Sequence, residues 1–598
     1  MTKFYFNTII NFFHCAPILS EPSTETINHI NTKAIKVGKI IAPRACNEIT
    51  EQYIKEIDYN PNSTFYKTWD KIKDTPRVLL LMDQLLHYAS THGTDYEAET
   101  YCPNEDPVKV DYKRYTVIEA VTKEELFNKI MNVLQSGIAL DSETVRAFCK
   151  YLIDYKVNKY DIDINTIKNR EAITYLCTHL HIFPNNPLTL LNVIYYICTG
   201  QTMVVKDYTS IRLCGWNANR IDLSLLNQEQ IKGLSTIFNR YKPIFVALKK
   251  HQPNKHVVNR ISKLSKKYHK PFKVGFWENF TNLPYITPRE VQDQVNKLTS
   301  PFKIVKLLEM IKLHKLQALY GLPRTFLIRN NKTWVNEYQM VPYPCNFDYA
   351  AEMLLSRLID LMAEVKSRTG VKTIKLPACT LTCPSSEKKF IGNIPIGSYY
   401  DLKDCNNYFG IYWKNEWGTR DFDLSIIQMS GEKIGWNSWF NHGGILFSGD
   451  MTNADPEATE MLYIPNKCPN GAIYINRYNG DPGSKFKLFF GQDKCEGFKK
   501  NYMVDPSTIT FEDIIKSGST QQIIGCILED RVYFLRLSQG ESAISRSAKD
   551  LNFLKSICLS HIELEPILKA VGYKIVDSEA DVDLSTLDSG KILSLFVF

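Results

Sequence analysis

Two carboxylates lie one residue apart in a stretch that has the composition of a β-strand. The segment GTRDFDLSI, residues 418–426, carries Asp421 and Asp423 among apolar neighbours. Because side chains alternate between the faces of a strand, the two aspartates share one face, while Phe422 and Leu424 share the other. Like charges on one face repel each other unless water or a cation separates them. The spacing alone is therefore consistent with a solvated strand face and equally with a cation site.

More acidic residues follow after a short apolar run. The stretch SGDMTNADPEATE, residues 448–460, contains Asp450, Asp455, Glu457 and Glu460. Calcium binds six to eight oxygens from carboxylates, carbonyls and water at about 2.3–2.6 Å. Two aspartates on one strand face and an acidic loop after a nearby strand supply about four or five of these oxygens. The chemistry of these residues indicates a calcium site, although less specifically than a complete motif would.

The other residue types that carry chemistry lack the spacing that catalysis or zinc binding requires. The 15 cysteines are scattered and include no C-x-x-C pair, which excludes zinc ribbons and is typical of reduced thiols in a cytosol. His87 and His92 are five residues apart and form no H-E-x-x-H motif. A G-x-S-x-G elbow and a dinucleotide fingerprint are also absent from the sequence. These absences predict that the protein is not an enzyme.

The chain opens on an apolar stretch, FYFNTIINFFHCAPIL, which Asn7, Asn11 and His14 interrupt. It is too short and too polar to span a membrane, and no small-residue cleavage site follows it. We therefore expect a packed or partner-binding N-terminal segment in a cytoplasmic protein without a membrane span.

Charge is unevenly distributed along the sequence. The net charge is +8, yet residues 401–598 hold 20 Lys+Arg against 27 Asp+Glu. Between Glu229 and Glu278 there are 12 Lys or Arg and no acidic residue. Aromatic residues at 241, 245, 268 and 272 interleave with this basic segment. Its candidate contact residues are Arg240, Lys242, Lys249, Lys250, Lys255, Arg260, Lys263, Lys266, Lys267 and Lys270.

Three interpretations of the basic segment are open. Lysines that track a phosphate backbone, with aromatic rings free to stack on bases, are typical of nucleic-acid binding. The segment could instead dock on an acidic surface, and the C-terminal half of this chain is one. In the third interpretation it is a solvated helical face. The residues that would then serve the core are Val246, Leu248, Val257, Val258, Ile261 and Leu264.

Up to residue 322 the sequence predicts successive short helices. Residues 300–321 have Ser as N-cap, Pro at the first helical position and Gly after the end. Thr122 and Glu125 have capping-box spacing, and Gly137 ends that helix. Periodic apolar runs cover residues 140–156, 165–182, 187–199, 227–250 and 256–268. We expect an α-helical array that could be of the helical-repeat type, although no repeat signature with fixed residues is present.

From residue 324 the pattern changes to strands. A short hairpin and a helix over about 349–366 lead into runs rich in β-branched and aromatic residues. Helices near 550–560 and 563–571 and a last apolar strand, KILSLFVF, follow. The predicted fold is multidomain α + β, in which the α-helical array precedes an antiparallel β-sandwich with accessory helices. The predicted segments are 1–115 (mixed or helical), 116–322 (helical, with the basic segment 230–277), 323–372 (hairpin and connecting helix) and 373–598 (sandwich).

Four motifs of the strand-rich part carry a family resemblance. IPIGSYYDL, YFGIYW, RDFDLSI and ILFSGDMTNADPEATEMLYI occur in an order that resembles the TerD-like family, named for bacterial tellurite resistance. The chain is most similar to large bacterial proteins that join a helical N-terminal region to a divergent TerD-like domain. The resemblance covers roughly residues 385–540 and is weaker through the helical front.

The resemblance implies a calcium site on one side of a β-sandwich. Family members bind the ion with a D-x-D-x-S strand motif and a later acidic loop. By match, Asp421, Asp423 and Ser425 correspond to the strand motif, Asp450 to the start of the loop, and Glu460 to its end. The adjacent acidic pair of the family is replaced by ADPEATE, in which Asp455 and Glu457 are the substitutes.

These observations lead to one predicted function and one alternative. We expect a non-enzymatic, cytoplasmic, stress- or defence-associated protein. In this prediction a helical scaffold carries a calcium-binding TerD-like domain, whose ion-ordered acidic loops present a surface to a protein partner. The alternative is an RNA- or DNA-binding helical scaffold that uses residues 240–273.

Overall fold

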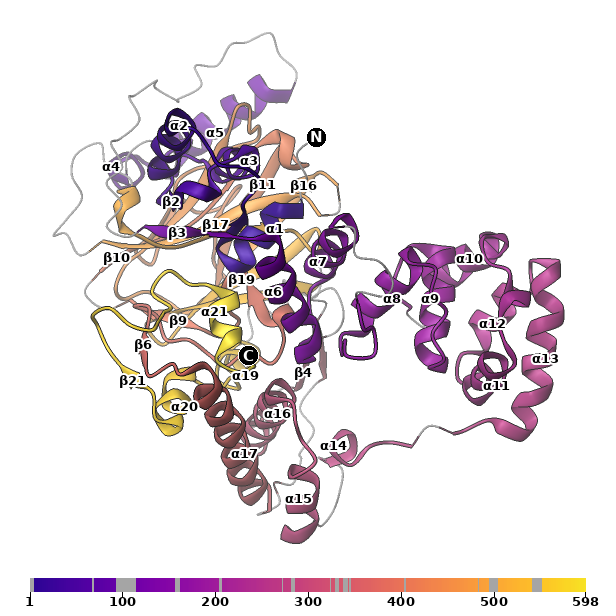
Figure 1. The fold of residues 1–598 in the computed structure, drawn as a ribbon. Helices are drawn as coiled ribbons and strands as arrows, with labels where there is room; N and C mark the ends of the chain where they lie inside the picture. The colour runs from indigo at the N-terminus through magenta and orange to yellow at the C-terminus, as the bar shows by residue number, and fades with distance from the viewer. Residues whose placement is uncertain are drawn as a thin grey trace. The chain divides into compact units, whose positions relative to one another are not determined.

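Tertiary contacts divide the chain into two compact units. In the computed structural model, unit 1 comprises residues 1–2, 10–120 and 284–598, and unit 2 comprises residues 3–9 and 121–283 (Figure 1). The structure describes residues 5–66, 69–92, 115–155, 162–203, 207–271, 273–280, 286–322, 324–327, 333–336, 343, 346–402, 405–481, 483–493, 504–539 and 551–597.

Unit 2 is helical, and the helix predicted after Thr122 begins where the sequence predicts. Thr122 and Glu125 form the capping box of α6 (Lys123–Ser136), and Gly137, with a left-handed φ of 82°, ends it. The predicted run 227–250 is two helices, because Pro243 lacks an N–H and starts a new one. The further helices are α7 (Ser142–Asp154), α8 (Arg170–His179), α9 (Pro187–Thr199), α10 (Tyr208–Trp216), α11 (Gln228–Ile237), α12 (Lys242–Leu248), α13 (Gln252–Tyr268) and α14 (Phe276–Asn279).

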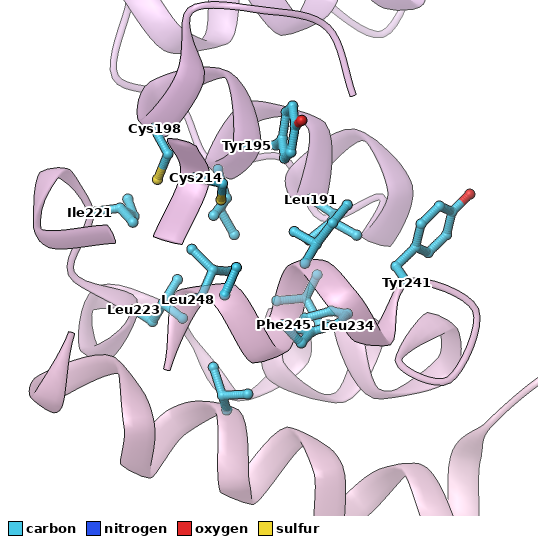
Figure 2. Packing of buried hydrophobic residues seen from close by; sticks show 14 of the residues in the cluster. Leu191, Tyr195, Cys198, Cys214, Ile221, Leu223, Leu234, Tyr241, Phe245 and Leu248 are labelled. Atoms are coloured by element: carbon cyan, nitrogen blue, oxygen red, sulfur yellow. The ribbon is translucent and has the colours of Figure 1, made fainter. Parts of the chain in front are cut away.

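Helices α9 to α13 enclose the hydrophobic core of unit 2. Helix α9 packs on α11, α10 on α12, and α11 on α13. Figure 2 shows Leu191, Leu234, Phe245 and Leu248 converging between these helices. Tyr241 also belongs to this cluster and is buried. The apolar spacing of the sequence therefore produced one shared core in this part of the chain.

Two six-stranded sheets form the greater part of unit 1. All neighbouring strands within them pair antiparallel. Sheet A has the order β13 (Asn441–His442), β14 (Ile445–Phe447), β15 (Ala458–Ile464), β10 (Asn406–Trp413), β17 (Lys485–Asp493), β18 (Ile509–Lys516). Sheet B has the order β12 (Lys433–Gly435), β11 (Asp421–Gln428), β16 (Gly471–Asn479), β19 (Gln521–Leu528), β20 (Arg531–Gln539), β9 (Tyr399–Asp401).

Aromatic side chains from the two sheets contact each other. Phe422 of sheet B lies 6.0 Å from Trp413 and 5.4 Å from Phe486 of sheet A, measured between ring centroids. Phe409 of sheet A lies 5.9 Å from Phe534 of sheet B. These rings are buried, and large aromatic side chains contribute strongly to the stability of such a core.

The N-terminal residues belong to the same unit as the sheets. Helices α2 (Thr24–Lys36), α3 (Glu48–Ile57), α4 (Trp69–Asp74) and α5 (Arg77–His92) accompany a small sheet of β1 (Cys15–Pro17), β3 (Thr116–Val121) and β2 (Lys39–Ile41). The amide of Thr459 donates to the Ser63 carbonyl at 2.8 Å, and Lys485 pairs with Glu56 at 2.9 Å. The sequence predicted 1–115 and 373–598 as separate segments. In the structure, polar contacts join residues of both segments within one unit.

Helices after residue 284 also belong to unit 1. They are α15 (Pro288–Val295), α16 (Pro301–Tyr320) and α17 (Asn346–Thr369). Glu309 of α16 pairs with His561 at 2.7 Å, which ties this helix to the C-terminal part. The predicted hairpin is present as β4 (Arg324–Leu327) and β5 (Thr333–Asn336).

The last apolar run corrects a prediction. KILSLFVF was predicted as a strand, but its first residues lie in α21 (Ser589–Ser594). Asp588 caps this helix by accepting the amide of Lys591, and Ile592 and Leu593 are buried. The physical reason is that a short apolar run fits a buried helix as well as a strand, and the N-cap decides.

The remaining elements are short. They are α1 (Tyr5–Phe13), α19 (Leu551–Cys558), α20 (Leu564–Val571), the hairpin of β7 (Phe390–Ile391) and β8 (Ile394–Pro395), and the parallel sheet of β21 (Lys574–Ile575), β6 (Thr373–Lys375) and β22 (Val582–Asp583). In the described part of the chain, none of the helices has the length and apolar character needed to cross a membrane.

Candidate cation site

Strand β11 presents Asp421 and Asp423 on one face, as the alternation predicts. Phe422 and Leu424 point the opposite way and are fully buried. The register places Asp423 opposite Asn476 of β16, whose side-chain amide donates to the Asp423 carboxylate at 2.8 Å. Both aspartates are themselves buried, which excludes the interpretation of a solvated strand face.

The loop between β14 and β15 adds a third carboxylate. Asp421, Asp423 and Asp450 each offer an oxygen, and these oxygens all lie within 4.8 Å of one another. Oδ1 of Asp421 is buried and has no hydrogen-bond partner among the described residues. Hard oxygens at this separation fit a calcium-sized cation, because such ions draw several carboxylate oxygens together.

Burial and mutual repulsion shift the protonation of these groups. Burial, with the neighbouring Asp423 and Asp450, raises the pKa of Asp421 to about 8. Burial and Asp450 raise the pKa of Asp423 to about 7. Both shifts have the same cause: a charged carboxylate is disfavoured where water is scarce and other carboxylates are close. These carboxyl groups therefore keep their protons to higher pH than ordinary aspartates do, unless a cation replaces the protons.

Glu460 of β15 connects the two segments that carry the aspartates. One oxygen of its fully buried carboxylate accepts the amide of Leu424 at 2.6 Å, and the other accepts that of Met451 at 3.0 Å. Burial, Asp450 and Asp423 raise its pKa well above the usual range. The structure thus places the predicted ligand Glu460 beside the cluster, as a group that holds β11 and the acidic loop together.

Besides Glu460, three predicted ligands lie outside the group of three carboxylates. Asp455 is exposed. Glu457 accepts the hydroxyls of Ser63 and Tyr412, both at 2.7 Å, so its carboxylate is engaged elsewhere. Ser425 is buried on the Asp423 face, opposite Tyr474 in the register. Asp455 and Glu457 therefore do not belong to the group of three carboxylates.

Lys433 of β12 brings an ammonium group toward the carboxylates. In the strand register, Lys433 lies opposite Ile427 of β11. Its side chain is therefore on the same face of sheet B as that of Asp423. Burial lowers the pKa of Lys433, while Asp423, Asp450 and Glu460 act to raise it. One ammonium group does not balance four buried carboxyl groups, so the centre keeps an excess of acidic groups that a divalent cation would compensate.

The sequence did not indicate that the N-terminal part contributes to this site. Gln84 and Tyr88 of α5 hydrogen-bond to Asp450, and His87 contacts Thr452 at 3.0 Å. The sequence shows His87 only as a histidine without a metal motif. Polar residues at positions 84, 87 and 88 share one helix face, and this spacing is the one signal that could have marked them.

The basic segment lies in unit 2, and most of its predicted contact residues are exposed. Lys249 is half-buried, and the exposed residues are Arg240, Lys242, Lys250, Lys255, Arg260, Lys263, Lys266, Lys267 and Lys270. On α13 these alternate with Val258 and Ile261, which are buried. Val246 was expected to be a core residue, but its side chain is 51% exposed, so that part of the prediction is wrong.

The aromatic part of the nucleic-acid prediction is largely wrong. Tyr241 and Phe245 are buried in the core of unit 2 and cannot stack on bases (Figure 2). Tyr268 is half-buried, and position 272 lies outside the described residues. Tyr208 and Trp216 belong to α10, which packs on α12, and they are 78% and 69% exposed.

Comparison of this chain with protein-family models, curated proteins and solved structures gives no match. The TerD-like resemblance therefore stays a prediction from the motifs. The candidate site is defined by its own geometry.

Proposed function

We propose that unit 1 binds a divalent cation at Asp421, Asp423 and Asp450, and that this ion is calcium because all the ligands are carboxylates. The observation that carries this proposal is the buried group of three carboxylates within 4.8 Å, which includes an Asp421 oxygen without a hydrogen-bond partner in the described residues. Buried carboxylates are expensive unless a cation, a proton or hydrogen bonds compensate them.

The donor set supports calcium over transition metals such as zinc and copper. The group contains carboxylates alone, and sites without imidazole or thiolate suit calcium, magnesium and manganese. Calcium tolerates irregular geometry, whereas magnesium requires a nearly ideal octahedron. The D-x-D-x-S resemblance supports the same ion. It is also the sole support for the stress or defence role.

In this proposal the ion does no chemistry on a substrate. Glu460 already joins β11 to the acidic loop. A cation bound by aspartates of both segments would hold the two segments together more firmly. The protein is then a non-enzymatic binding module, and its ordered loop contributes to a surface for a protein partner.

Thermal unfolding with calcium and with chelator tests the proposal. Calcium that binds only the folded state stabilises it by about 2.7 kcal/mol at a hundredfold excess over the dissociation constant. We expect calcium to raise the melting temperature of the wild-type protein. Asp423→Asn should reduce this shift strongly, because the variant lacks one ligand oxygen and one negative charge.

Two matched variants sharpen this test. Asp455→Asn removes a carboxylate from the same loop but outside the group, and its calcium shift should equal that of the wild type. Lys433→Met removes the opposing ammonium and should strengthen calcium binding. Identical melting with calcium and chelator in the wild type, at saturating calcium, contradicts the proposal.

A second candidate function has one observation in its favour. Lys250 passes beside Gly215, where an added Cβ would lie 3.0 Å from the lysine side chain, and exposed Trp216 follows directly. An exposed tryptophan one residue along the helix from this lysine contact is of the kind that stacks on nucleic-acid bases. We keep nucleic-acid binding by unit 2 as an alternative, and docking of this segment on an acidic surface stays a prediction.

A further inference from the structure

Helix α5 lies against the loop that carries Asp450. The side-chain amide of Gln84 donates to the Asp450 carbonyl at 2.8 Å, and the Asp450 amide donates to the Gln84 oxygen at 3.1 Å. The hydroxyl of Tyr88 donates to Oδ2 of Asp450. Three atoms of one candidate ligand are thus held by a helix that is 366 residues away in the sequence.

The chain before α5 holds the same loop from another side. The amide of Tyr66 donates to the Ser448 carbonyl at 3.0 Å. Gly449 has a left-handed φ of 89°, and a Cβ there would lie 2.9 Å from the Phe65 side chain. The position therefore requires glycine, both for its backbone conformation and for this close approach. Asp450 is consequently presented by a loop that the N-terminal part contacts at the two preceding residues, Ser448 and Gly449.

The orientation of α5 is unusual for a surface helix. Its buried face includes the polar residues Gln84 and His87, with Leu80 as an apolar member. Five other apolar residues of the helix are 50–67% exposed: Val78, Leu79, Met82, Leu85 and Leu86. Amphipathic helices ordinarily bury the apolar face. Hydrogen bonds to the acidic loop, together with the buried Leu80, therefore hold α5 in this orientation.

Outer hydrogen bonds of this kind orient the ligands of metal sites. A carboxylate that binds a metal is usually fixed by further donors, and removal of one typically costs about 10–100-fold in metal affinity. Tyr88 donates a hydrogen bond to Oδ2 of Asp450, and Gln84 hydrogen-bonds to the backbone of Asp450. Together they limit the directions in which the Asp450 carboxylate can point. Because Gln84 is only 2% exposed, water does not compete for its hydrogen bonds to Asp450.

We propose that Gln84 and Tyr88 are positioning residues of the cation site, and that docking of α5 and cation binding stabilise each other. This inference rests on the proposed function. The coupling must be reciprocal: if docked α5 raises cation affinity, bound cation must stabilise docked α5 by the same factor. The apolar face of α5 would then be displayed in a fixed orientation when the site is occupied.

Calcium titration of Gln84→Leu and Tyr88→Phe by calorimetry tests the affinity side. We expect each variant to weaken binding about 10–100-fold. Tyr88→Phe removes a single hydroxyl, and so remains informative if Gln84→Leu destabilises the fold. Met82→Gln changes the exposed face of the same helix and should bind calcium as the wild type does.

Hydrogen exchange of the amides in residues 77–92 tests the reciprocal side. Calcium should slow their exchange in the wild type but not in Asp423→Asn, an effect that a merely structural role of α5 would not produce. Wild-type affinity in both α5 variants, or exchange that calcium leaves unchanged, overturns the inference while the cation site stands. Absence of calcium binding by the wild type overturns the proposed function, and this inference with it.

Discussion

A carboxylate inside a protein needs a proton, a cation or several donors. Asp423 has the Asn476 amide and Glu460 has two backbone amides, whereas Oδ1 of Asp421 has no hydrogen-bond partner in the described part of the chain. The cluster is therefore incompletely compensated by the groups around it. At the residue scale, this imbalance is what links stability, pH and cation binding.

The raised pKa values of Asp421 and Asp423 predict how stability depends on pH. In the unfolded chain an aspartate loses its proton near pH 4, whereas in the folded protein these two keep theirs to about pH 7–8. The folded state thus binds more protons over this interval. Without a cation, stability should fall as the pH rises from about 4 to 8, by up to about 1.4 kcal/mol per pH unit for each group.

Calcium should abolish this decline, because the ion takes the place of the protons. Chemical denaturation at pH 5, 6, 7 and 8, in chelator and in calcium, measures the effect. Asp423→Asn should flatten the curve in chelator. Equal stability at pH 5 and pH 8 in chelator would show that the carboxylates are less coupled than the geometry indicates.

At the scale of elements, two helices expose faces that the core does not use. Helix α5 turns apolar residues outward and polar ones toward the acidic loop. Helix α13 follows the ordinary pattern: Val258 and Ile261 are buried, and its lysines are exposed. A solvated basic face thus needs no partner to explain it.

Charge reversal separates a binding face from a solvated one. If unit 2 binds nucleic acid, Lys266→Glu with Lys267→Glu should weaken binding and make it less dependent on salt. The expected change is about 0.9 log units per tenfold salt for each duplex phosphate that the variant no longer neutralises. Trp216→Ala should weaken single-strand binding by about 1–3 kcal/mol if the ring stacks on a base. Fluorescence anisotropy at about 50 and 200 mM salt measures both effects.

A control with the same change in net charge is available on α16. Lys303→Glu with Lys306→Glu alters two exposed lysines of unit 1. It should leave the binding by unit 2 unchanged. No binding of single-stranded RNA or duplex DNA by the wild type at the lower salt would remove the nucleic-acid alternative.

At the scale of the whole molecule, the chain builds two cores from interrupted stretches of sequence. Unit 1 takes residues 10–120 and 284–598, and unit 2 takes most of the chain between them. The candidate cation site and the residues proposed to position it lie in unit 1. Unit 2 has a hydrophobic cluster of its own. Cation binding should therefore act on one core and leave the other unaffected.

Scanning calorimetry tests this separation. We expect two unfolding transitions, of which calcium shifts only one. Leu234→Ala, in the core of unit 2, should lower the other transition, because a buried leucine replaced by alanine typically costs about 2–5 kcal/mol. A single transition that both calcium and Leu234→Ala shift would show that the two units unfold together.

Local features were readable from the sequence, because they depend on neighbours along the chain. The capping box at Thr122 and Glu125, the helix end at Gly137 and the shared face of Asp421 and Asp423 all follow from spacing. Asp450 was predicted as a ligand from the family resemblance, because spacing along the chain could not place it beside Asp421 and Asp423. In these cases short-range geometry and a known motif were sufficient.

Only the tertiary structure decided which acidic residues meet and what holds them. Glu457 turns toward Tyr412, Asp455 is exposed, and Glu460 bonds to backbone amides, although all three lie within one short stretch. The contacts of α5 with Asp450 join residues 366 apart, and no periodicity encodes such a pairing. The physical reason is that burial and hydrogen-bond partners arise when distant segments pack. The chemistry of a carboxylate depends on those partners and not on its place in the sequence.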